Sequence, residues 1–97
     1  MTLQISTQSL SEFISSKFGY PASCSYDVGE NMYLMNVFMV PSNKKNEIED
    51  QVYDISDDLN LFMVVFVFTE EETRKYYPDK VPKASIAPQM ILSQAAQ

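Results

Sequence analysis

The stretch that decides the fold runs from residue 32 to residue 68 and reads MYLMNVFMVPSNKKNEIEDQVYDISDDLNLFMVVFVF. Its first nine residues, 32–40, are apolar except for Asn36, and its last eight, 61–68, are all apolar. Both runs have the length and the β-branched and aromatic content of buried strands. The segment between them, at about 43–59, has helical spacing. A strand, a helix and a strand in this order predict two parallel neighbours in one sheet, joined by a crossover.

The helix predicted at 43–59 is acidic outside one narrow apolar stripe. The stripe has spacings of four, three and four residues and consists of Ile48, Val52, Ile55 and Leu59. The other faces carry six carboxylates: Glu47, Glu49, Asp50, Asp54, Asp57 and Asp58. Lysines in the first turn and aspartates in the last oppose the helix macrodipole, at about 0.3–1 kcal/mol each when exposed. Such a face is either simply solvated or serves a partner, and the sequence leaves both readings open.

Residues before this stretch predict a helix at about 8–18 and one arm of a hairpin. Ser9 and Glu12 fit a capping box, and Gly19 with Pro21 would end the helix. Polar and apolar residues then alternate over 23–28, as in a half-buried outer strand. A short turn at 29–31 leads to the first apolar run and predicts a hairpin.

Beyond the stretch, Thr69 and three glutamates predict a short helix that ends before Pro78. We therefore expect one compact α+β domain over residues 1–77, in the order α-β-β-α-β-short α-tail, built on a small mixed sheet. Residues 78–97 form a proline-punctuated C-terminal tail that is either docked or flexible. The apolar residues 86 and 90–92 of this tail offer a C-terminal edge strand or a segment that orders on a partner.

The composition removes most enzyme chemistries. The chain has no histidine, one cysteine and two glycines, neither of them in a glycine-rich loop. These counts disfavour Ser/His and Cys/His nucleophile pairs, most zinc sites and phosphate cradles. No acidic cluster follows the calcium-loop pattern. We therefore expect a non-enzymatic chain with no catalytic residue, no metal and no cofactor.

Charge and hydropathy limit the surroundings and the partners. Seven basic against thirteen acidic residues give a net charge of −6, which argues against nucleic-acid binding. The longest apolar run, eight residues, is far shorter than the roughly 20 residues of a membrane span, and no secretory signal pattern precedes it. We expect a cytoplasmic protein without a membrane association.

The first functional hypothesis is a protein-binding module that acts as an inhibitor, antidote or adaptor. It would occlude a basic site on a partner protein through the acidic helix, because such a face steers association with a basic surface. Toxin antidotes and phage-encoded inhibitors of nucleic-acid enzymes are typically small acidic α+β proteins, an analogy of size and charge. The expected contacts are Glu47, Asp50, Asp54, Asp57 and Asp58.

The alternative hypothesis is a small-ligand-binding or regulatory domain that forms a homodimer. Six methionines, several in or beside the strands, give an adaptable apolar sheet face. A pocket on that face would draw its polar contacts from Tyr26, Tyr33 and Asn36. Self-association would also bury a sheet that is apolar on both faces.

Overall fold

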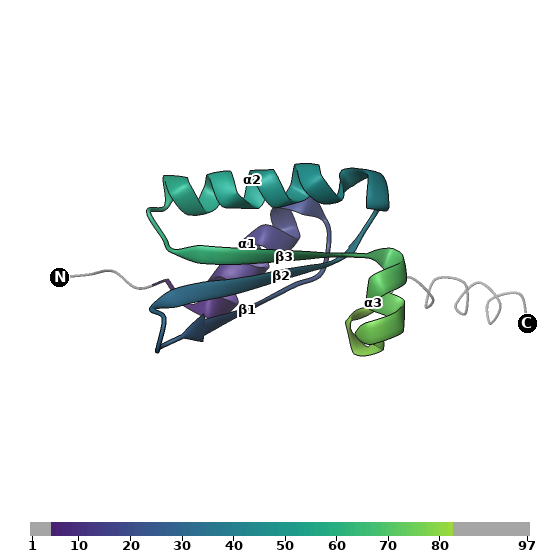
Figure 1. Ribbon diagram of the computed structural model, residues 1–97, viewed down its shortest axis with the longest axis horizontal. Coiled ribbons are helices and arrows are strands. Elements are labelled where there is room, and N and C mark those ends of the chain that lie inside the picture. Colours follow the sequence, from purple (N-terminus) through teal and green to yellow (C-terminus); the bar gives the residue numbers. More distant parts are fainter. Residues whose placement is uncertain (1–4, 83–97) are drawn as a thin grey trace, which may run out of the picture.

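A computed structural model describes residues 5–82 as an α+β fold, which confirms the predicted class and element order (Figure 1). Two helices and a three-stranded mixed sheet form the body of the molecule, and a third short helix follows the last strand. The apolar cluster of the tail, residues 86 and 90–92, lies outside the described residues.

The sheet has the order β1-β2-β3, with the second strand in the middle. Strand β1, Ala22–Asp27, pairs antiparallel with β2, Met32–Val40, through the predicted hairpin. Strand β3, Met63–Thr69, pairs parallel with β2, as the crossover argument predicts. Both β1 and β3 are therefore edge strands of the described sheet.

Strand β3 begins two residues later than the apolar run suggests. The N–H of Leu61 donates to the carbonyl of Ser56 at 2.9 Å, and Asn60 has a φ of 56°. This left-handed residue and its hydrogen bonds end the preceding helix, so residues 61 and 62 complete the turn into the sheet. Hydropathy does not separate an apolar turn from the strand that follows it.

Helix α1, Thr7–Phe18, is capped by a different serine from the one the spacing indicates. The N-cap is Ser6, whose Oγ accepts from the N–H of Ser9 at 3.0 Å, so the capping box of Ser9 and Glu12 is wrong. Glu12 instead accepts from the side-chain amide of Gln8. At the other end the structure confirms the C-cap: Gly19 has a φ of 80° and donates to the carbonyl of Ser15.

Helix α2, Lys45–Asp58, follows a 3-10 turn, Ser42–Lys44, and runs alongside β3 in Figure 1. Helices α1 and α2 cover the same face of the sheet. Their buried side chains join those of β2 and β3 in one core: Leu10, Ile14, Tyr33, Met35, Val37, Val40, Ile48, Val52, Val65 and Val67. Burial of these apolar side chains is the main stabilising contribution to the fold.

The opposite face of the sheet, which we call the open face, is covered at one end. Strand alternation and register place six residues on it: Ser23, Ser25, Leu34, Asn36, Val64 and Phe66. Phe66 is 46% exposed, whereas Phe38 at the covered end is buried beneath the rings of Phe68 and Tyr77. The apolar composition of β2 and β3 suggests that both faces of the sheet are covered. On the open face, the short third helix covers only one end of the sheet.

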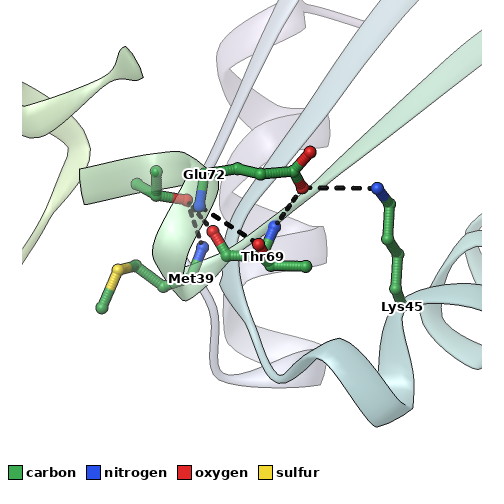
Figure 2. Close-up of polar contacts among 5 residues, drawn as sticks. Met39, Lys45, Thr69 and Glu72 are labelled. Carbon is green, nitrogen blue, oxygen red and sulfur yellow. Dashed lines mark hydrogen bonds and ion pairs between the residues drawn. The ribbon is translucent and has the colours of Figure 1, made fainter. Parts of the chain in front are cut away.

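Helix α3, Glu70–Tyr76, is fixed to the sheet by one buried hydroxyl (Figure 2). Thr73 accepts from the N–H of Met39 at 2.9 Å and donates to the carbonyl of Thr69 at 2.7 Å. Met39 has a φ of 65°, where the register of β2 shifts against β3. A capping box joins Thr69 to Glu72, and Glu72 also pairs with Lys45 at 3.3 Å. Strands β2 and β3 and helix α2 therefore meet at the start of α3.

Candidate protein-binding surface

The five carboxylates expected to contact a partner all lie exposed on α2. They are Glu47, Asp50, Asp54, Asp57 and Asp58. Within residues 5–82 the single salt bridge joins Lys45 to Glu72, so none of the five has a basic partner there. The negative charge of α2 is not neutralised by this part of the chain.

The carboxylates divide between two flanks of the helix. Successive side chains of a helix are about 100° apart around its axis. The apolar stripe of α2 points to the core, and the side chains on its two sides point toward β3 and toward α1. Glu49 and Asp57, four residues before and after Tyr53, share its flank, and the Tyr53 hydroxyl accepts from the N–H of Val65 in β3. We call this the β3 flank. Asp50 is exposed and lies opposite the apolar stripe, between the two flanks. Glu47, Asp54 and Asp58 share the other, which we call the α1 flank.

An apolar groove of about 460 Å³ lies along the α1 flank, between α1 and the C-terminal half of α2. Its lining includes Phe13, Lys17, Ile55, Asp58 and Leu59. Phe13 is 50% exposed and Leu59 is 42% exposed, although both have the helical spacing of core residues. Apolar surface with a charged rim has the composition of protein–protein interfaces.

Helical spacing places Phe13 and Leu59 on the apolar faces of their helices, and the sequence alone does not indicate this groove. The signal was present in the width of the apolar face of α1. A helix on a three-stranded sheet cannot bury Leu10, Phe13, Ile14 and Phe18 equally, because these side chains span more than one facing surface. The same argument applies to Leu59, which lies at the end of α2.

The last turn of α2 concentrates negative charge where the helix already has its negative dipole end. Asp57 and Asp58 lie there, and no basic residue accompanies them in that turn. Lys17 lines the groove with Asp58, but the two make no salt bridge. A cationic side chain from another molecule would relieve this unfavourable arrangement.

Two of the three residues proposed for a ligand pocket, Tyr26 and Tyr33, lie together, and Asn36 lies on the other face of the sheet. Tyr33 is buried on the helix-covered face and donates its hydroxyl to the carbonyl of Ile5 at 2.8 Å. Tyr26 lies beside it, with ring centroids 4.9 Å apart, and its hydroxyl bonds Asn31. Asn36 is on the open face. None of the three expected ligand contacts lines the groove between α1 and α2.

Cys24 has the environment of a packing residue. It lies against the core, its Sγ is 3.8 Å from the carbonyl of Ser25, and burial raises the pKa of its thiol to about 11. At neutral pH the thiol keeps its proton and is a poor nucleophile. In the described part of the chain, no three histidine, cysteine, aspartate or glutamate residues cluster as metal ligands.

Comparison with protein-family models, with curated proteins and with solved structures finds no match to this chain. None of the helices over residues 5–82 is long and apolar enough to cross a membrane. Functional inference therefore depends on the geometry of the surface itself.

Proposed function

We propose that this chain is a non-enzymatic protein-binding module, an inhibitor, antidote or adaptor that occludes a basic site on a partner protein. The binding surface is the exposed face of α2 with the groove beside it. Contacts are made by Glu47, Asp50, Asp54, Asp57 and Asp58. The observation that supports this most directly is that five exposed carboxylates on one helix lack any basic partner among residues 5–82.

The surroundings of these carboxylates support a protein partner over a small cation. The groove on the α1 flank offers apolar contact area at Phe13 and Leu59, next to the charge of Asp58. Affinity in protein complexes comes mainly from such desolvated anchors, while peripheral charges set partner choice and association rate. A partner with basic side chains around one apolar anchor fits both parts of the surface.

The test is a tagged pull-down from lysate of the source cell, read by mass spectrometry. The wild-type chain is compared with a triple variant, Asp54→Lys with Asp57→Lys and Asp58→Lys. We expect one stoichiometric partner with the wild type and none with the variant. Candidate partners are then purified and titrated with both proteins.

A matched control separates the site from the overall charge. Glu12→Lys with Glu30→Lys and Asp79→Lys changes three exposed carboxylates elsewhere and removes the same net charge of −6. This control keeps the partner if α2 is the binding surface. Equal loss in both triple variants, or full retention in both, contradicts the proposal.

Self-association is the second candidate, and the half-exposed open face favours it. Leu34, Val64 and Phe66 leave an apolar strip there that a second copy could cover. Sedimentation velocity at increasing concentration then gives a species of twice 11.1 kDa. If such a dimer forms and no partner is captured, the alternative of a regulatory, ligand-binding domain is favoured. Measuring the thermal shift with panels of metabolites and nucleotides tests that alternative.

A further inference from the structure

The outer edge of β3 has no neighbouring strand in the described part of the sheet. Strand β2 pairs with one side of β3, and the other side faces outward beneath α2 (Figure 1). An uncovered strand edge presents backbone N–H and C=O groups that a further strand can pair with.

The register identifies which backbone groups point outward. The N–H of Tyr33 in β2 donates to the carbonyl of Phe62, so residue 62 faces β2. Successive residues of a strand alternate, so Met63, Val65 and Val67 direct their N–H and C=O groups to the outer edge. The hydrogen bond from the N–H of Val65 to the Tyr53 hydroxyl, at 3.1 Å, agrees with this assignment.

Strand β3 carries none of the residues that usually protect an edge, so the overhanging helix α2 is its protection. Its sequence, MVVFVFT, contains no charged residue and no proline. Natural sheets place lysine, proline or a bulge on such strands because these features oppose pairing with other chains. Among the described residues, the hydroxyl of Tyr53 is the one side-chain group bonded to an outward N–H of β3.

The two sides of this edge differ in chemistry. Above it lies the β3 flank of α2, with Glu49 and Asp57 one helical turn before and after Tyr53. Below it lies the open face, where Phe66 is 46% exposed. Side chains of an added strand alternate between these two sides. Positive side chains would meet the carboxylates, and apolar side chains would lie beside Phe66.

Charge argues against a second copy of this chain as the added strand. Antiparallel pairing of two β3 edges about a twofold axis would continue the sheet and set the two α2 helices side by side. The β3 flanks of both helices, each with two carboxylates, would then face one another. Like charges at such a junction repel, whereas a basic segment removes the repulsion.

We propose that β3 accepts an extended segment of a basic partner protein as a fourth strand, with basic side chains toward α2 and apolar side chains toward the open face. This proposal deepens the proposed function, on which it depends, by naming the segment of the partner that is bound. Main-chain hydrogen bonds supply affinity, and the alternating surroundings supply specificity.

Tyr53 has a defined role in this exchange. Its hydroxyl occupies the N–H of Val65 in the free chain and gives way to a carbonyl of the added strand. Removal of the hydroxyl in Tyr53→Phe therefore removes a competitor and tightens binding, by about fivefold for one ordinary hydrogen bond. An interaction that used only charge on α2 would not respond to this substitution.

The test uses a fluorescent peptide of about nine residues that alternates lysine and valine, and a scrambled peptide of the same composition. Binding to the full chain is measured by anisotropy at about 0.15 M salt. We expect binding of the alternating peptide, tighter binding by Tyr53→Phe, and at least about tenfold weaker binding by Phe66→Lys. Phe62→Lys, at a residue 83% exposed outside the strand, is the control and binds as the wild type does.

A pair of charge variants locates the basic side chains. Glu49→Lys with Asp57→Lys changes the β3 flank and weakens peptide binding about tenfold. Glu12→Lys with Glu30→Lys makes the same charge change on exposed residues outside α2 and has an effect of less than about threefold, because screening weakens distant charges.

Hydrogen exchange gives a further readout that does not depend on any variant. The amide of Met63, a residue that is only partly buried, exchanges fast in the free chain and slowly with the peptide. Slow exchange without peptide means that the edge is already occupied and overturns the proposal. Equal affinity for the scrambled peptide, or no effect of both Phe66→Lys and Tyr53→Phe, also overturns it. If the edge proposal fails in this way but the triple lysine variant at Asp54, Asp57 and Asp58 still captures no partner in the pull-down, the proposed function is retained.

Discussion

At the scale of single residues, the hydroxyl of Thr73 has the most demanding position. The residue is fully buried and its Oγ links two backbone groups, accepting from Met39 and donating to Thr69 (Figure 2). Met39 has a left-handed backbone, so its N–H points out of the regular ladder and depends on this acceptor. No sequence pattern announces the pair, because the two residues are 34 positions apart.

Thr73→Val keeps the shape of the side chain and removes the hydroxyl. We expect the free energy of unfolding to fall by about 1–3 kcal/mol, because the partly buried N–H of Met39 loses its acceptor. Urea denaturation followed by circular dichroism measures the change. Thr73→Ser keeps the hydroxyl and is the control; a larger loss with serine than with valine would contradict the role given to the hydrogen bonds.

At the scale of elements, the sequence predicts most of the helices and strands, and the failures have local causes. Both Thr69 with Glu72 and Ser9 with Glu12 fit the capping-box spacing, but only the first pair forms one. The difference is Ser6, a second residue that is suitable as an N-cap. It lets α1 begin earlier in the chain, with Leu10 packed in the core. Spacing identifies candidate caps, and packing chooses among them.

The capping box of α3 makes the stability of the fold depend on pH. The Thr69 N–H, as the main cause, and then Lys45 lower the pKa of Glu72 below its ordinary value. A lowered pKa stabilises the folded state above the ordinary value, and this contribution disappears as the pH falls through the lowered one. We expect Glu72→Gln to be less stable than the wild type at neutral pH, with the difference shrinking in thermal melts as the pH falls below the ordinary pKa of a glutamate.

A constant difference between the two proteins across that pH range would contradict this assignment. Glu71→Gln removes a neighbouring exposed carboxylate that takes no part in the capping box and serves as the control. Its melting temperature relative to the wild type should change far less with pH.

At the scale of the whole molecule, the candidate site could be predicted only in part. The carboxylates were predictable because a narrow apolar stripe leaves the rest of α2 outside. Their division into two flanks was not, since it depends on α1 and β3 packing against opposite sides of that helix. The arrangement of Tyr26, Tyr33 and Asn36 could not be predicted from the sequence either. Successive residues of a strand alternate between the faces of the sheet, so Asn36 lies on the face opposite Tyr26 and Tyr33.

The net charge of −6 affects the molecule as a whole. Mutual repulsion of like charges destabilises the compact state, and salt screens it. We expect the melting temperature to rise by a few degrees between about 0.02 and 0.3 M sodium chloride. The Asp54, Asp57 and Asp58 lysine variant carries no net charge and should show little of this rise. A fall with salt in the wild type would mean that attractive pairs outweigh the repulsion.

The uncharged edge of β3 also has a consequence for the protein in concentrated solution. A seven-residue segment rich in valine and phenylalanine, without proline or charge, has the composition of segments that stack into cross-β fibrils. In the folded chain α2 overhangs this segment, with Tyr53 bonded to it and a row of carboxylates beside it. Resistance to fibril formation is therefore a property of the helix: a change that frays α2 exposes the segment while β2 and β3 are still paired.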